Sequence, residues 1–378
     1  MRKDFLVFGS PLIEQDEINE VVDCLKSGWL GSGPRTARFE KEFAAYNGVD
    51  YAAAVNSCTA ALHLSMIAAG IGPGDEVITT PLTFCATVNA IIHCGATPVL
   101  ADVDPTTHNI DPAQIEAKIT DKTKAVLIVH FAGRACAMDE IMALVDKHAL
   151  VLIEDCAHAI ETTYKGRHVG TFGEYGCFSF YVTKNLITGE GGMVLGRDYE
   201  AICRIKTLAL HGMSCDAWAR FSDAGYKHYL VTEPGYKYNM MDLQASLGLH
   251  QLAKVEKRFV RREEIWARYD RELAGLPLVL PAPSEPNTRH GRHLYTILLT
   301  PEAPLTRDQF LETMNANKIG TGVHYMSVPE HPFYQSAFLW NPDHYPHARD
   351  IGRTTASLPL SAKLNDQDVD DVIKTVRK

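Results

Sequence analysis

The stretch Leu150-Val-Leu-Ile-Glu154-Asp-Cys-Ala-His158 decides the fold class of this chain of 378 residues. It begins with four apolar residues and ends with charged and polar ones. A short apolar run of this kind is typical of a strand that is buried on both faces of a parallel sheet. Ligands bind at the carboxyl ends of such strands, so we expect Asp155 and His158 at a site. The alternative is structural: Asp155 caps the next segment and His158 is a core histidine.

The same rhythm continues on both sides of this stretch. Strand-like runs at residues 76–80, 97–102 and 125–129 alternate with helix-spaced segments at 57–70, 87–94 and 139–148. This alternation predicts an α/β fold with a mostly parallel sheet and helices on both faces.

The pattern of predicted secondary structure changes after Asn239. Residues 241–275 predict one long charged helix, and the proline-rich segment 276–286 predicts a boundary. An α+β pattern follows, with a strand at 294–299 and helices at 306–317 and from about Asp366. We therefore expect a large domain with an N-terminal arm over residues 1–245 and a small α+β domain over residues 246–378.

Composition excludes several classes of protein. The chain has 37 Lys and Arg against 46 Asp and Glu, a net charge of −9, which argues against nucleic acid or an anionic membrane as a partner. The longest apolar runs are about five residues, against about 18 for a membrane span. The nine scattered cysteines form no Cys-x-x-Cys pair, so we expect neither a disulfide framework nor a metal site. A cytoplasmic location is the resulting expectation.

Two further motifs contain residues that can take part in catalysis or ligand binding. Lys184 stands in Ser179-Phe-Tyr-Val-Thr-Lys184-Asn185, just before the glycine-rich segment 189–192. A buried lysine has a lowered pKa and becomes a nucleophile toward carbonyls, whereas most lysines are exposed and inert. The segment Asn56-Ser-Cys-Thr-Ala-Ala61 joins a strand end to a helix start, which predicts either a phosphate cup or a plain helix cap by Ser57 or Thr59.

Taken together, the three motifs indicate pyridoxal phosphate (PLP). This cofactor needs a phosphate cup, a lysine for the covalent bond, a carboxylate against the pyridine nitrogen and an aromatic plate over the ring. Thr59, Lys184 and Asp155 supply the first three, and Phe84 is the candidate plate.

At this point the chain resembles the DegT/DnrJ/EryC1/StrS sugar aminotransferases. The resemblance rests on Ser-x-Thr-Ala-Ala-Leu at 57–62, Glu-Asp-x-Ala-His at 154–158 and Ser-Phe-x-x-Thr-Lys-Asn-x-x-x-Gly-Glu-Gly-Gly at 179–192, and it runs from about residue 31 to 324. It implies the aspartate aminotransferase fold (fold type I), with PLP and pyridoxamine phosphate as the two cofactor forms. It also implies Lys184 as Schiff-base lysine, Asp155 as partner of the pyridine nitrogen and His158 as a contact of the phenolic oxygen.

The resemblance further implies the phosphate ligands and the assembly. Thr59 and Ser179 match phosphate ligands, with help from the backbone of Cys58. Asn239 matches an asparagine that reaches the phosphate of the neighbouring subunit, so a homodimer with shared active sites is implied. Two residues depart from the family pattern: Cys58 replaces the usual glycine or alanine, and Glu161 stands where glycine is common.

The implied substrates are L-glutamate, which leaves as 2-oxoglutarate, and a nucleotide-linked keto sugar. Segments 211–218 and 234–239 are similar to members that act on UDP-4-keto pentoses and 6-deoxyhexoses, notably the UDP-4-amino-4-deoxy-L-arabinose aminotransferase type. Candidates for substrate contacts are Arg35, Lys237, His324 and Tyr325, although for each of them packing or solvation is the commoner role of such a residue.

Three alternatives stay open from sequence. One is a PLP-dependent nucleotide-sugar dehydratase, although that branch carries histidine where this chain has Lys184. Another is a non-catalytic regulatory protein on the same fold, against which Lys184 and Asp155 both argue. An NAD-binding protein is a weaker rival, because no Gly-x-Gly-x-x-Gly follows a predicted strand.

Overall fold

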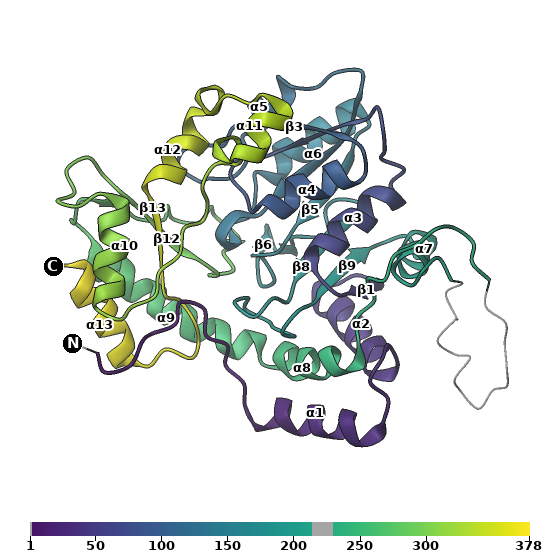
Figure 1. Cartoon of the computed structure of the whole chain (residues 1–378), viewed down its shortest axis with the longest axis horizontal. Coiled ribbons are helices and arrows are strands. Elements are labelled where there is room, and N and C mark those ends of the chain that lie inside the picture. Colours follow the sequence, from purple (N-terminus) through teal and green to yellow (C-terminus); the bar gives the residue numbers. More distant parts are fainter. Residues whose placement is uncertain (1, 214–229) are drawn as a thin grey trace.

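A central seven-stranded sheet organises the molecule (Figure 1). The computed structural model describes residues 2–213 and 230–378. The strand order is β1-β9-β8-β5-β4-β2-β3, in which β9 alone runs against its neighbours and the strands from β8 to β3 are parallel. The strands are β1 (Tyr51–Val55), β2 (Glu76–Thr79), β3 (Thr97–Leu100), β4 (Thr123–Val129), β5 (Val151–Asp155), β8 (Tyr175–Ser179) and β9 (Gly192–Gly196).

Helices cover both faces of this sheet, as the apolar runs predict. In β4, Ala125 and Leu127 pack into one core while Val126 and Ile128 pack into another, so every side chain of the run is buried. The first face carries α3 (Cys58–Ala68), α4 (Cys85–His93) and α7 (Tyr199–Ala209). The opposite side carries α2 (Pro34–Asn47), α5 (Pro112–Glu116), α6 (Met138–His148) and α8 (Asp242–Ala253). Outside it, α1 (Gln15–Ser27) packs against α8.

A second core lies under a three-stranded sheet of order β10-β12-β13, near the two termini in Figure 1. Its strands are β10 (Leu278–Val279), β12 (Tyr295–Leu299) and β13 (Thr355–Leu358), and its helices are α9 (Val255–Leu273), α10 (Arg307–Ala316) and α13 (Asp366–Val376). Two short helices, α11 (Pro332–Phe338) and α12 (Pro346–Thr354), pack toward the large sheet. A small sheet joins β6 (Thr163–Tyr164), β7 (Arg167–His168) and β11 (Thr288–Arg289).

The prediction of a single helix over 241–275 is wrong. Two helices, α8 and α9, meet at Lys254, whose φ of −109° and ψ of −1° end the first one. The break follows from packing: Leu249 of α8 lies in the large-domain core, whereas Tyr269 of α9 lies in the small-domain core. We therefore propose a domain boundary near Lys254, close to the expected 245/246 but with α8 on the large side. The N-terminal segment contacts the small domain, because Leu6 pairs with Ile319.

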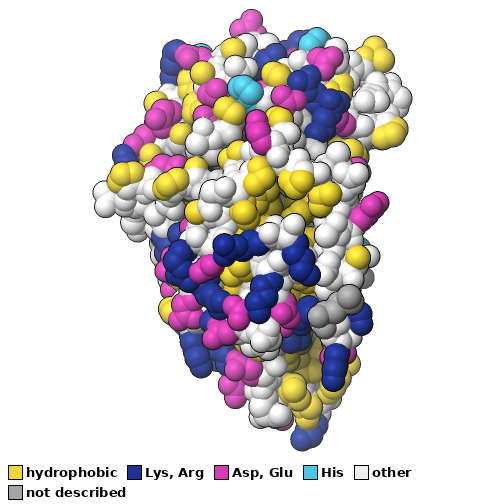
Figure 2. Space-filling model, turned by 90° about the vertical axis from the view of Figure 1, so that its left-hand side faces the viewer, with side chains coloured by type: hydrophobic (Ala, Val, Ile, Leu, Met, Phe, Trp, Pro, Cys, Tyr) yellow, Lys and Arg dark blue, Asp and Glu magenta, His cyan; other side chains and the backbone are white. Residues whose placement is uncertain are grey.

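Charges on the face near the termini are mixed in sign. Figure 2 shows Lys and Arg side chains interspersed with Asp and Glu there, around an apolar patch. Ion pairs near the termini include Arg2 with Asp368 at 2.7 Å and Arg261 with Asp366 at 2.8 Å. In the part of the chain that is described, no helix has the length and apolar content that a bilayer crossing requires.

Candidate active site

A cavity of about 500 Å³ opens at the carboxyl ends of the parallel strands. It collects most of the side chains that the sequence singles out, although they come from five separate segments. The predicted residues that line it are Cys58, Thr59, Phe84, Asp155, His158, Ser179, Lys184, His324 and Tyr325.

Asp155 ends β5 and is almost completely buried. Burial raises the pKa of Asp155, while hydrogen bonds from the Ala157 N–H (3.1 Å) and the Thr87 hydroxyl (2.9 Å) oppose the rise. The Cys58 sulfur lies 3.8 Å from the same carboxylate. A neighbouring cation stabilises a buried carboxylate as an anion. The site around Asp155 therefore favours a ligand with a positive charge, such as the protonated pyridine nitrogen of PLP.

Thr87 is a site residue that the sequence analysis missed. Its hydroxyl donates to Asp155 and lies 2.8 Å from the hydroxyl of Thr83, which lies two residues before α4 begins. Since Thr87 has one proton to give, Thr83 is the donor in the second bond. The spacing of four residues was the available signal, but it carried no hint that Asp155 lies opposite.

Lys184 lies in the turn between β8 and β9, and its backbone N–H donates to Tyr181 at 2.9 Å. Burial lowers the pKa of Lys184 to about 8, with the neighbouring Cys58 and Asp155 acting in the opposite direction. A substantial fraction of the amine is therefore neutral near physiological pH. This is the protonation state in which lysine attacks a carbonyl carbon.

The N-terminus of α3 forms the predicted anion cup. Ser57 caps the helix by accepting the N–H of Ala60 at 3.1 Å. The N–H groups of Cys58 and Thr59 occupy the first helical turn, where no acceptor exists within the helix. A phosphate fits these free donors and the positive helix end. The helix-cap interpretation is confirmed at Ser57, and the phosphate interpretation, which uses different donors, stays a prediction.

Gly192 lets β9 approach this cup closely. A Cβ atom at position 192 would lie 2.5 Å from the carbonyl carbon of Ser57 and 2.7 Å from the backbone nitrogen of Cys58. Real Cβ atoms do not come so close to backbone, so only glycine fits without displacing the start of α3. Ser179, at the end of β8, lines the cavity next to this strand.

His158 is held from both sides. Its Nδ1 accepts the backbone N–H of Ala132 at 3.2 Å, and its Nε2 lies 3.0 Å from the Tyr325 hydroxyl. Burial and the nearby Lys184 keep the pKa of His158 well below its usual value, so the ring is neutral with its proton on Nε2. Its predicted contact with the cofactor's phenolic oxygen stays a prediction.

Aromatic residues form the rim and the far wall of the cavity. Phe84 is 58% exposed, with its ring centroid 6.1 Å from that of Tyr325, a position open to a flat ligand. His324 is fixed by Ser357, 2.7 Å from its Nδ1, and burial lowers the pKa of His324 to about 3.

Three predicted residues do not line the cavity of the chain. The guanidinium of Arg35 is held by Glu20 at 2.7 Å, which takes it out of the substrate role within one subunit. Lys237 is exposed to solvent and lies outside the lining of the cavity. Asn239 donates to the Ser32 hydroxyl at 2.7 Å, and its Oδ1 is buried without a partner among the described residues.

Glu154 has a structural role beside the site. Its carboxylate accepts the N–H groups of Gly170, Phe172 and Gly173 at 2.7–2.8 Å and lies 3.0 Å from Nε2 of His130. Glu154 and His130 lie with Cys156 in a buried group whose ligand atoms are within 4.8 Å of one another. These polar contacts fix the loop 170–173 behind the strand that carries Asp155.

The fold is that of the type I PLP-dependent enzymes. It places a buried lysine, a carboxylate and a helix N-terminus that can bind an anion around one cavity, as PLP requires. The chain belongs to the DegT/DnrJ/EryC1/StrS aminotransferase family, whose pattern matches residues 11–377. It is therefore an aminotransferase, and PLP is its cofactor. Of the described residues, Lys184, Asp155 and the α3 N-terminus fit that cofactor.

Comparison with known proteins agrees with this assignment. The chain is 50% identical over 378 residues to the spore coat polysaccharide biosynthesis protein SpsC of Bacillus subtilis, covering 100% of this chain and 97% of SpsC. The structure is similar to the PLP form of the putative sugar aminotransferase Spr1654 from Streptococcus pneumoniae, with a TM-score of 0.91, 33% identity and coverage of 98% and 97% of the two chains. Helicobacter pylori PseC, an aminotransferase of pseudoaminic acid biosynthesis, gives 0.91 at 29% identity, with 99% and 98% covered.

Proposed function

We propose that this aminotransferase moves the amino group of L-glutamate to the keto group of a nucleotide-linked keto-deoxy sugar. The C4 position and a UDP carrier are the specific form of the proposal. The observation that carries it is an open cavity of about 500 Å³ lined by both Lys184 and Asp155, close enough for the carboxylate to affect the pKa of the lysine. The polysaccharide biosynthesis given for SpsC and the description of Spr1654 as a putative sugar aminotransferase support a sugar acceptor.

In this proposal the residues of the chain have separate tasks. When bound, PLP supplies an electron sink that makes the Cα–H bond of an amino acid acidic. The Asp155 carboxylate keeps a proton on the ring nitrogen, and the amide groups of Cys58 and Thr59, with Ser179, bind the phosphate. Lys184, with its lowered pKa, then takes and returns the proton as general base and acid.

The electrostatics of the cavity support an assembly of two subunits. Glutamate brings two carboxylates and a nucleotide sugar brings a diphosphate, yet Lys184 is the one Lys or Arg among the described residues that line the cavity. Further cations must come from outside this lining. We propose a homodimer in which Asn239 of the partner subunit and nearby groups complete each site, with Lys237, His324 and Tyr325 as substrate contacts.

Two impaired variants test the shared site. Lys184→Ala and Asn239→Ala each damage a different component, so a mixed dimer of the two contains one intact site if the components come from different subunits. Refolding or co-expressing the two variants should then restore activity that neither has alone. Absence of restoration in a demonstrated mixed dimer, or full activity in a demonstrated monomer, contradicts the proposal.

The reaction itself is tested with a panel of nucleotide 4-keto and 3-keto sugars and glutamate. The expected product is the aminated sugar, detected by mass, with 2-oxoglutarate formed in equal amount. A product that has lost a hydroxyl without any need for glutamate would instead identify a dehydratase. Turnover of none of these sugars, with the cofactor bound, would favour the regulatory alternative.

A further inference from the structure

Asn185, the residue directly after Lys184, is fixed by three contacts from two separate segments. Its amide nitrogen donates to Oε2 of Glu161 at 2.9 Å and to the carbonyl of Gly291 at 2.9 Å. Its Oδ1 lies 3.2 Å from Nδ1 of His293, and because an amide oxygen can only accept, His293 is the donor. Both amide hydrogens are therefore used, and the oxygen also has a partner.

Glu161 is one of the two departures from the family pattern, and the residues around it accommodate its charge. Its side chain is completely buried and forms an ion pair with Arg262, whose side chain is 3% exposed. Arg262 comes from α9, and it also donates to the carbonyl of Arg292 at 3.2 Å. A buried glutamate of this kind persists only with a cation and further hydrogen bonds, which Arg262 and Asn185 provide.

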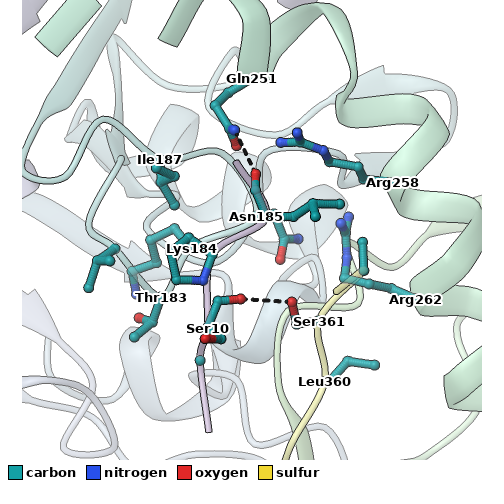
Figure 3. Close-up of a pocket in the computed structure, with 15 residues that line it drawn as sticks. Ser10, Thr183, Lys184, Asn185, Ile187, Gln251, Arg258, Arg262, Leu360 and Ser361 are labelled. Carbon is teal, nitrogen blue, oxygen red and sulfur yellow. Dashed lines mark hydrogen bonds between the residues drawn. The ribbon is translucent and has the colours of Figure 1, made fainter. Parts of the chain in front are cut away.

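The arrangement connects the small domain to the lysine turn. Figure 3 shows Lys184 and Asn185 in one turn, with Arg258 and Arg262 extending from α9 toward it. The space between them is about 30 Å³, room for about one water molecule, so the turn is closely supported on the side away from the cofactor cavity.

We propose that Glu161, held by Arg262, is a positioning residue that sets the orientation of Lys184 through Asn185. This inference rests on the proposed role of Lys184 as the residue that binds the cofactor covalently. The position of the lysine then depends on the contact between α9 of the small domain and the large domain. Glu161 touches no reacting atom, and its effect reaches Lys184 through the backbone of the turn.

The same helix offers a matched control. Arg258 lies one turn before Arg262 and forms a buried ion pair with Glu17 at 2.9 Å, with side chains 6% and 0% exposed. Glu17 contacts Lys254 and Gln251, and among the described residues it forms no hydrogen bond with Asn185. Both pairs are buried and use an arginine of α9 that lines the space beside the lysine turn, and they differ in that Glu161, unlike Glu17, accepts a hydrogen bond from Asn185.

The experiment compares Glu161→Met/Arg262→Met with Glu17→Met/Arg258→Met. Replacing a buried ion pair by apolar side chains often leaves stability unchanged, so both variants are designed to fold. Each apoprotein is mixed with PLP, and the rate of visible absorbance change is measured. Borohydride reduction and peptide mass then give the fraction of Lys184 that carries the cofactor. Melting temperatures are recorded in parallel.

We expect capture of PLP by Lys184 to slow by about 10- to 100-fold in the first variant alone, the effect of a misplacement of about 1 Å. Asn185→Ala, with the ion pair intact, should show the same defect and serves if the double variant does not fold. Equal rates in all variants overturn the inference while the proposed function stands. If the wild type itself links no PLP to Lys184, the proposed function fails and the inference falls with it.

Discussion

The hydroxyl of Tyr325 lies 3.0 Å from Nε2 of His158, and the opposite nitrogen of that ring accepts the backbone N–H of Ala132. The proton on Nε2 therefore points at the tyrosine oxygen, which accepts it. Burial raises the pKa of Tyr325 far above its usual value, so the tyrosine keeps its own proton. That proton is free to be donated to a ligand in the cavity.

Tyr325→Phe should therefore impair substrate handling more than folding. The change removes a donor into the cavity and leaves Nε2–H of His158 without its acceptor, a loss that typically costs about 1 to 3 kcal/mol for a buried group. We expect KM for the sugar to rise with a small change in melting temperature. His324→Gln, beside it in the chain, serves as a comparison in the same assay. An unchanged KM and kcat in Tyr325→Phe would contradict the donor role.

The pKa of Lys184 predicts the pH dependence of cofactor capture. Burial lowers this pKa to about 8, and only the neutral amine attacks the aldehyde of PLP. The rate of capture by the apoprotein should rise with pH and level off above about 8. Stopped-flow absorbance over a pH series measures it. Lys184→Ala is the control and should show no reducible linkage; a rate that still rises up to the usual lysine pKa of about 10.4 would contradict the shift.

Asp155→Asn tests the electrostatic role of the carboxylate. Asparagine keeps the shape, but its single oxygen replaces only one of the two carboxylate oxygens that accept from Thr87 and Ala157, and it cannot hold a proton on the pyridine nitrogen. We expect kcat to fall by about 10²- to 10³-fold, as for the loss of one preorganised electrostatic contact. Thr87→Val is the matched variant and should have a smaller effect, because the carboxylate itself remains. Comparable losses in both would favour a purely structural role for Asp155.

Gly192→Ala tests the close contact between β9 and the start of α3. The added Cβ would lie 2.5 Å from the backbone of Ser57, so the phosphate cup must shift. We expect weaker binding of PLP, measured by equilibrium dialysis, together with a lower melting temperature. Gly72→Ala is the control, because its nearest contact would be 3.9 Å away. Wild-type PLP affinity in Gly192→Ala would place the phosphate elsewhere.

Local sequence patterns were sufficient for the architecture. The apolar runs predict β2, β4 and β5 to within two residues, because strands buried on both faces leave a signal that is independent of distant contacts. The helix cap at Ser57 is equally local. The motifs around Asp155 and Lys184 predicted a shared site because parallel strands bring their carboxyl ends to one edge.

The sequence by itself thus determined the fold class, the family and the candidate catalytic and binding residues. Only the tertiary structure decided which partners those residues have. Thr87 beside Asp155 and Arg262 against Glu161 are contacts between residues that are 68 and 101 positions apart. The break at Lys254 depends on packing into two different domains. Periodicity reports which face of an element is buried, and it carries no information on what the buried face meets.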